Sequence, residues 1–215
     1  MVTLAEATYD TPHGPGRIVQ RRSSRPWACL VLTHGAGGGI DSPDLALLTA
    51  RLPRLGVSVV RVEMPWRTAG KRIASAPRIL DECFVSLVDH LRPRSPMVVG
   101  GRSAGARVAC RTGRSLGAVA VVALAFPLHP PGKPERSRAD ELAGSGLPTH
   151  VVQGGRDPFG RPEEFRVGTS FTVLPDADHS LRVPKRAALD QAAADELLIA
   201  GVVGFLRTKV PARAG

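Results

Sequence analysis

The sequence has few aromatic residues and no long apolar run. Only 4% of its 215 residues are Phe, Trp or Tyr, so a folded core has to be built mainly from Val, Leu and Ala. The longest apolar stretch, residues 117–126, is too short to cross a bilayer as a helix. The first ten residues lack the basic and then apolar pattern of a signal peptide. We therefore expect a cytoplasmic protein that does not enter a membrane.

Cysteine is scarce as well. Cys29, Cys83 and Cys110 are an odd number, and none of them forms the C-x-x-C spacing that is typical of zinc and redox sites. This pattern predicts reduced, buried thiols. We expect no metal site and no organic cofactor.

Lysine occurs at only four positions, although the net charge is +10, so arginine supplies nearly all of the positive charge. A basic chain suits nucleic acid or an acidic partner. The arginines are scattered, however, and no aromatic platform accompanies them. This distribution predicts a solvated basic surface and disfavours nucleic acid as a partner. The oligomeric state stays open.

Apolar segments and helical patterns alternate along the chain. Continuous apolar runs predict buried strands near residues 28, 58, 98, 119, 150 and 171. Periodic apolar stripes between them predict helices, and a weak hairpin with a strand at Arg17–Gln20 precedes them. This alternation predicts an α/β fold, with a mostly parallel central sheet flanked by helices, as a single domain over residues 1–215.

Several local features are expected around that sheet. Ser42 and Ser75 are candidate N-caps of two helices, and residues 63–74 between those helices are expected to be an irregular loop. Residues 127–148 are rich in proline and charge, so we expect a loop or small flap outside the core with a short helix at 138–143. A final helix is expected over 195–206.

A serine lies at the point where a strand meets a helix. Met97–Val99 read as a buried strand, Gly101–Gly105 form the pattern G-x-S-x-G around Ser103, and the next residues favour helix. Strand, sharp turn and helix are the context in which this pattern predicts a nucleophile elbow. Glycines on either side would let strand and helix approach closely. The alternative is a glycine-rich turn that binds phosphate at the helix N-terminus.

Two later strand ends carry the residues that would activate this serine. Asp157 follows the strand near 150, and His179 follows the strand near 171. Functional residues collect beyond the carboxyl ends of parallel strands. The predicted triad is therefore Ser103 as nucleophile, His179 as general base and Asp157 as its carboxylate partner. Asp176 and Asp178 are rivals for the carboxylate.

The remaining candidates surround this triad. The N–H of Ala104 is expected to donate to an oxyanion, with a second donor from Ala36 or Gly37 after the first parallel strand. Arg102 and Arg107 are expected to face solvent or to pair with local carboxylates. The substrate-pocket candidates are His34, Trp66, Phe126, His129 and Phe159. The large apolar residues among them suit the core equally well, and His34 could instead order the oxyanion loop.

The motifs H-G-A-G-G, G-G-R-S-A-G-A-R-V-A, F-P-L-H-P-P-G-K-P-E, G-x-R-D-P-F-G and D-H-S-L span residues 34–181. Together they resemble the α/β-hydrolase superfamily, in particular its small dienelactone-hydrolase-like members. The similarity extends to a branch with testis-expressed hydrolase-like proteins and a subunit of the NSL histone-acetyltransferase complex. The resemblance implies the same three triad positions. It also implies that some relatives act as interaction scaffolds. This chain has no large cap insertion, so we expect a minimal cap and an open site covered only by Leu128–Leu147.

The sequence thus predicts a serine hydrolase of the carboxylesterase type that cleaves a small acyl substrate through an acyl-serine intermediate. The alternative is a non-catalytic module with this fold that binds an acidic partner or nucleic acid through its arginines. The nature of the acyl bond and the length of the acyl group stay open.

Overall fold

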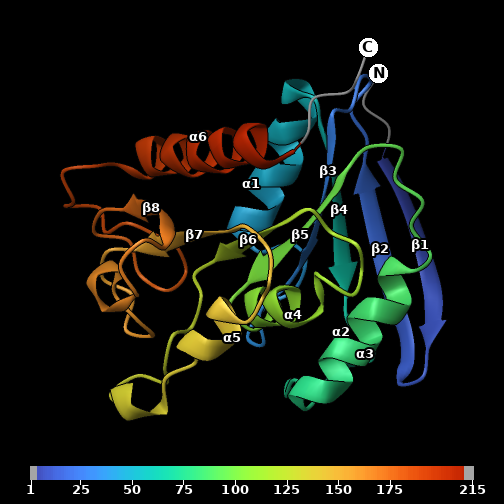
Figure 1. The fold of residues 1–215 in the computed structure, drawn as a ribbon, viewed down its shortest axis with the longest axis horizontal. Helices are drawn as coiled ribbons and strands as arrows, with labels where there is room; N and C mark the ends of the chain where they lie inside the picture. Colours follow the sequence, from blue (N-terminus) through green and yellow to red (C-terminus); the bar gives the residue numbers. More distant parts are fainter. Residues whose placement is uncertain (1–3, 211–215) are drawn as a thin grey trace.

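Eight strands form one sheet in the computed structural model, which describes residues 4–210 (Figure 1). The strand order is β1-β2-β4-β3-β5-β6-β7-β8. An antiparallel pair, β1 (Leu4–Thr11) and β2 (Gly14–Arg21), lies at one edge, and β2 also runs antiparallel to β4. The other strands are parallel: β3 (Ala28–Thr33), β4 (Val57–Glu63), β5 (Met97–Arg102), β6 (Ala120–Leu124), β7 (Thr149–Gly154) and β8 (Ser170–Leu174). The predicted α/β class and mostly parallel sheet are confirmed.

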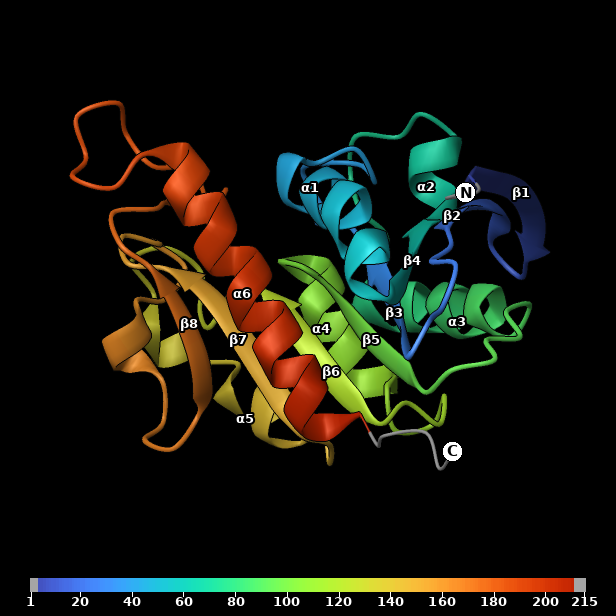
Figure 2. The same ribbon diagram turned by 90° about the horizontal axis from the view of Figure 1, so that it is seen from above.

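Helices cover both faces of this sheet. The α-helices are α1 (Pro43–Arg51), α2 (Pro65–Thr68), α3 (Pro77–Val88), α4 (Ala104–Thr112), α5 (Ala139–Ala143) and α6 (Gln191–Lys209). Short 3-10 turns lie at Leu52–Leu55, Pro134–Arg136 and Pro162–Glu164. Figure 2 shows α1 and α6 on one face and α3 and α4 on the other. None of the helices within residues 4–210 combines the length and apolar character that a membrane span needs.

The apolar runs read from the sequence are strands buried on both faces. Val98 packs into the layer beneath α1 and α6, whereas its neighbour Val99 packs into the layer beneath α3 and α4. The same alternation holds for Val122 and Val121 of β6. Successive strand residues point to opposite faces, so a strand between two helical layers needs apolar residues at every position. This requirement explains why these segments show no alternation of polar and apolar residues.

Four local expectations differ from the structure. The residue that caps α3 is Ala76 rather than Ser75, and residues 63–74 contain the short helix α2 instead of only loop. The segment 127–148 is not wholly outside the core, because Leu128 and His129 at its start are buried. The final helix α6 begins four residues earlier and ends three residues later than the predicted 195–206. Short helices and helix ends are the features that periodicity resolves least.

Candidate active site

Ser103 adopts a strained backbone conformation between β5 and α4. Its φ is 52° and its ψ is −113°, outside the regions that residues with a side chain favour. The flanking glycines make this turn possible: a Cβ on Gly101 would lie 2.5 Å from the carbonyl carbon of Gly105, and one on Gly105 would lie 2.5 Å from the oxygen of Thr33. Strand and helix are thus in backbone contact around the serine. This is the geometry that the G-x-S-x-G pattern predicts.

The structure brings Ser103, His179 and Asp157 together from the ends of three different strands. His179 Nε2 lies 3.0 Å from Ser103 Oγ, and its Nδ1 lies 2.8 Å from Asp157 Oδ2. The Asp157 side chain is fully buried, whereas that of His179 keeps 18% of its surface exposed. A carboxylate that accepts from Nδ1–H leaves Nε2 free to accept a proton from the serine hydroxyl. The arrangement can therefore activate Ser103 as a nucleophile.

Neighbouring groups fix the orientation of the Asp157 carboxylate. The Phe159 N–H donates to Oδ1 at 2.8 Å, and Gln153 Nε2 donates to Oδ2 at 2.9 Å. Gln153 is fully buried at the end of β7, and its amide nitrogen also lies 2.8 Å from the Gly160 oxygen. We did not identify Gln153 from the sequence. Its signal is a long polar side chain that directly follows the apolar pair Val151 and Val152 at the carboxyl end of a strand.

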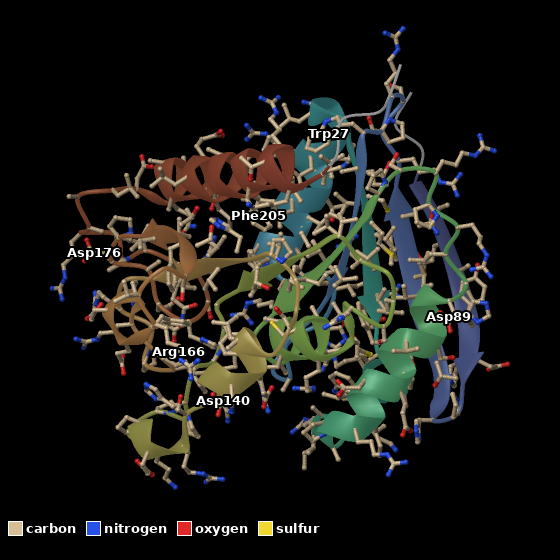
Figure 3. The ribbon with its side chains drawn as sticks, in the orientation of Figure 1. Trp27, Asp89, Asp140, Arg166, Asp176 and Phe205 are labelled. Atoms are coloured by element: carbon tan, nitrogen blue, oxygen red, sulfur yellow. The ribbon has the colours of Figure 1, made fainter. Side chains whose placement is uncertain are left out.

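The two rival carboxylates lie elsewhere. Asp178 Oδ1 accepts from the N–H groups of Ser180 and Arg182, and thereby closes the turn that follows β8. Asp176 is exposed, with a φ of 58°, and lies at the periphery of the molecule (Figure 3). Within residues 4–210, His179 makes no hydrogen bond with either of them. Of the three carboxylates considered, only that of Asp157 contacts the His179 ring.

The loop after β3 lies against the serine. A Cβ on Gly35 would come within 3.2 Å of Ser103 Cβ, and Ala36 and Gly37 follow in an exposed turn. Ala104 is the first residue of α4, where N–H groups have no partner inside the helix. The backbone N–H groups of Ala36 and Ala104 have no backbone acceptor in the described part of the chain. Their assignment as oxyanion donors stays a prediction that this placement permits.

His34 holds that loop rather than facing a substrate. Its Nε2 accepts from the Met64 N–H at 3.1 Å, so its Nδ1–H donates to the Gly35 oxygen at 3.0 Å. Burial lowers the pKa of His34 and favours the neutral ring that this bonding pattern needs. The ring is almost completely buried and packs against Trp66, with centroids 4.8 Å apart. His34 therefore connects the end of β3 to the end of β4.

The other pocket candidates occupy three kinds of position. Phe126 and Trp66 are buried in the apolar layer beneath α3 and α4, which favours their interpretation as core residues. His129 is also buried and bonds Glu164 at 2.8 Å; the Pro130 carbonyl and then the Glu164 carboxylate raise its pKa. Phe159 is half-buried and stacks on the His179 ring, with centroids 4.1 Å apart. Of these four, Phe159 is the one in contact with the predicted triad.

A second serine–histidine contact joins the first residues of β7 and β8. His150 Nδ1 is 2.8 Å from Ser170 Oγ, and its Nε2 is 2.9 Å from Thr172 Oγ1. Phe205 of α6 stacks on the ring with centroids 5.0 Å apart, and Figure 3 shows this side chain between α6 and the sheet. Burial lowers the pKa of His150. This pair belongs to the amino ends of the strands, opposite the elbow.

The comparison with known families places this chain. A family model described as an alpha/beta hydrolase domain matches residues 26–206, a range that contains all three triad candidates. The chain belongs to the α/β-hydrolase family. No curated protein matches the sequence.

Solved structures of α/β hydrolases share this fold over nearly their whole length. An α/β serine hydrolase without a lid from Xanthomonas campestris is 20% identical, with a TM-score of 0.71 and coverage of 97% of this chain and 96% of its own. A serine hydrolase homologue from Coxiella burnetii is 16% identical (TM-score 0.72, coverage 95% and 98%). A dienelactone hydrolase from Anabaena variabilis is 16% identical (TM-score 0.71, coverage 98% and 99%). Within residues 4–210, the helices and strands of this α/β hydrolase include no separate lid domain.

Proposed function

We propose that this α/β hydrolase is a serine hydrolase that cleaves carboxylic ester bonds in small acyl substrates. The observation that carries the proposal is the hydrogen-bonded series from Ser103 through His179 to Asp157, with the serine on a strained elbow. Strain at a single non-glycine residue costs free energy and is retained where function requires it. In this proposal Ser103 is the nucleophile.

The reaction follows from the positions of the polar groups. His179 Nε2 takes the hydroxyl proton of Ser103 as Oγ forms a bond to the substrate carbonyl carbon. The resulting oxyanion accepts hydrogen bonds from the N–H of Ala104 and from that of Ala36 or Gly37. Collapse of this intermediate breaks the bond to the alkoxide, which takes the proton from His179 and leaves as an alcohol. Water then forms a bond to the acyl carbon as His179 takes its proton. Collapse of this second intermediate breaks the bond to Ser103 Oγ, which regains the proton from His179 as the acid leaves.

The choice of an ester as substrate rests on the similarity of this fold to that of a known hydrolase. The structural neighbours include a dienelactone hydrolase, and a lactone is a cyclic ester. The resemblance of the motifs to the testis-expressed and NSL-complex branch, which belongs to this proposal, leaves the substrate undefined. The lack of a lid favours a substrate that reaches Ser103 directly from solvent. We therefore expect short-chain esters to be accepted.

A fluorophosphonate probe tests the nucleophile. We expect it to label the folded protein, with mass spectrometry locating the adduct on Ser103, and we expect Ser103→Ala to abolish both labelling and the hydrolysis of p-nitrophenyl acetate. Ser170→Ala is the matched control and should keep both activities. An adduct on Ser170 would assign the reaction to the His150 pair. Folded protein that neither labels nor hydrolyses the ester would favour the non-catalytic interaction module.

A further inference from the structure

The Arg102 guanidinium lies between the loops that hold the proposed catalytic residues. Arg102 directly precedes Ser103, and its Nη2 donates to the backbone oxygen of His179 at 2.9 Å. Its Nε lies 3.3 Å from Asp44 Oδ2, and its Nη1 lies 3.4 Å from where a Cβ of Gly35 would be. The side chain is only 12% exposed. One cation thus touches the His179 loop, the loop after β3 and the start of α1.

Asp44 is buried opposite this cation. Its side chain is 2% exposed and lies in the first turn of α1, directly after the loop that contains Ala36 and Gly37. Arg102 is the cation paired with this carboxylate in the described chain, and the Ser42 hydroxyl and the Leu45 N–H stabilise its charge more weakly. Neither carboxylate oxygen has a partner in full hydrogen-bond geometry. Burial raises the pKa of Asp44, and the positive charge of Arg102 opposes that rise. A buried carboxylate depends chiefly on its counter-ion to remain charged.

We propose that Arg102, anchored by Asp44, is a positioning residue that fixes the His179 backbone relative to Ser103 and the oxyanion loop. This inference rests on the proposed serine hydrolase function. The bond to the backbone oxygen of His179 restrains that residue at its own peptide unit, close to the ring that has to meet Ser103 Oγ. Proton transfer between oxygen and nitrogen needs that contact to stay within hydrogen-bond reach. Catalysis is sensitive to such placement, because a displacement of about 1 Å can lower a rate by about 100-fold.

The test removes both charges together. Arg102→Met alone would leave Asp44 buried and unpaired, which destabilises the fold. The double variant Asp44→Asn, Arg102→Met is neutral at both positions. For p-nitrophenyl acetate we expect its kcat to fall by about 10- to 100-fold with KM nearly unchanged, and the rate of fluorophosphonate labelling to fall equally. Arg102→Lys should recover part of kcat, because an ammonium can still donate to the His179 oxygen.

A matched control lies on α4. Arg107 pairs with Glu141 of α5 at 2.5 Å, and within residues 4–210 neither side chain makes a hydrogen bond or ion pair with a triad residue. Glu141→Gln, Arg107→Met therefore removes an ion pair away from His179, while Arg111, which also pairs with Glu141, keeps its pair with Asp81. We expect wild-type kcat from this control. Wild-type kcat and labelling rate in the Asp44 and Arg102 double variant would overturn the inference and leave the proposed function intact. Absence of labelling in the wild-type protein would instead overturn the function.

Folding of the double variant is checked by its melting temperature and circular dichroism. If it does not fold, Arg102→Lys is compared with Arg107→Lys, since both retain the charge. A fall in kcat confined to Arg102→Lys supports the positioning role. Equal kcat in the two lysine variants overturns it.

Discussion

Two histidines of this α/β hydrolase contact a serine, and they do so in different regions. At the carboxyl ends of the strands, His179 lies 3.0 Å from Ser103. At the amino ends of β7 and β8, His150 lies 2.8 Å from Ser170. A phenylalanine stacks on each ring, Phe159 on the former and Phe205 on the latter. Judged by the serine–histidine distance alone, the second pair is the better candidate.

The two histidines differ in the group that their second ring nitrogen contacts, the one that does not face the serine. That of His179 contacts the Asp157 carboxylate, whereas that of His150 contacts the Thr172 hydroxyl. A carboxylate stabilises the imidazolium that forms when the histidine takes a proton, and a hydroxyl supplies no compensating charge. Burial also lowers the pKa of His150, which opposes protonation of its ring.

The backbones differ as well. Ser103 has a positive φ at the start of a helix, where N–H groups lack partners, while Ser170 is the first residue of the regular strand β8. A nucleophilic serine needs donors for the oxyanion next to it. Under the proposed function, a short serine–histidine contact indicates catalysis only where a carboxylate and free N–H groups lie beside it.

The largest expected effect is on kcat, and it comes from replacing the residue that bonds the second ring nitrogen of each histidine. Asp157→Asn should lower kcat for p-nitrophenyl acetate by about 10⁴-fold, because the amide no longer selects the productive tautomer or stabilises the imidazolium. Thr172→Val at the other pair should leave kcat unchanged. Steady-state kinetics on both purified variants check this. Equal, small losses would show that neither ring acts as a base.

Much of this arrangement could be predicted from the sequence. Strands buried on both faces give unbroken apolar runs, and the residue after such a run lies at the strand end where sites form. That logic placed Ser103, Asp157 and His179 in one region, and the structure brings them within hydrogen-bond distance. The glycines at 101 and 105 likewise occupy positions with no room for a side chain.

Side-chain partners across the fold could not be predicted. Nothing local in the sequence tells that Arg102 reaches the His179 oxygen, 77 residues away, or that Gln153 turns its amide to Asp157. Phe126 shows the opposite limit: it follows a strand like a site residue, yet its side chain packs into the core. Which way a side chain turns at a strand end depends on the tertiary structure, which periodicity does not describe.

The stacked phenylalanines give the second test. Phe205→Ala should destabilise the fold by about 3–5 kcal/mol, as is usual for truncation of a buried phenylalanine, and should leave kcat unchanged at a temperature where the variant is folded. Phe159→Ala should lower kcat by about 2- to 10-fold, corresponding to the roughly 0.5–1.5 kcal/mol of an aromatic pair, with little loss of stability. Urea unfolding and kinetics on both variants separate the effects. A large kcat loss in Phe205→Ala would contradict the assignment.

Replacing a glycine beside each serine–histidine pair with alanine should have a smaller effect. A Cβ at Gly101 would meet the backbone of Gly105, and one at Gly201 of α6 would meet the Thr172 side chain at 2.0 Å. Gly101→Ala and Gly201→Ala should each cost about 1–3 kcal/mol of stability through overpacking. Only Gly101→Ala should also lower the labelling rate, because it displaces the elbow. A reduced labelling rate in folded Gly201→Ala would link the His150 region to the reaction.

The smallest expected effect is the pH dependence that His150 contributes to stability. Its folded-state pKa is lowered below the ordinary 6.5 by burial, so the unfolded chain binds more protons once the pH falls below about 6.5. The free energy of unfolding therefore decreases between that pH and the folded-state pKa, by at most about 1.4 kcal/mol per pH unit for one group.

His150→Gln lacks this titration and retains a side chain that can bond Ser170 and Thr172. We expect the stability of the wild type relative to this variant to shrink as the pH is lowered from 7.5 to 5, measured by urea unfolding at each pH. The buried His34, whose pKa is also lowered, titrates in both proteins and cancels from the difference. Ester hydrolysis at pH 7.5 should be the same in both. A stability difference that stays constant over this range would show that the pKa of His150 is not lowered in the folded protein. The lowered pKa could then no longer be used as an argument against His150 as a catalytic base.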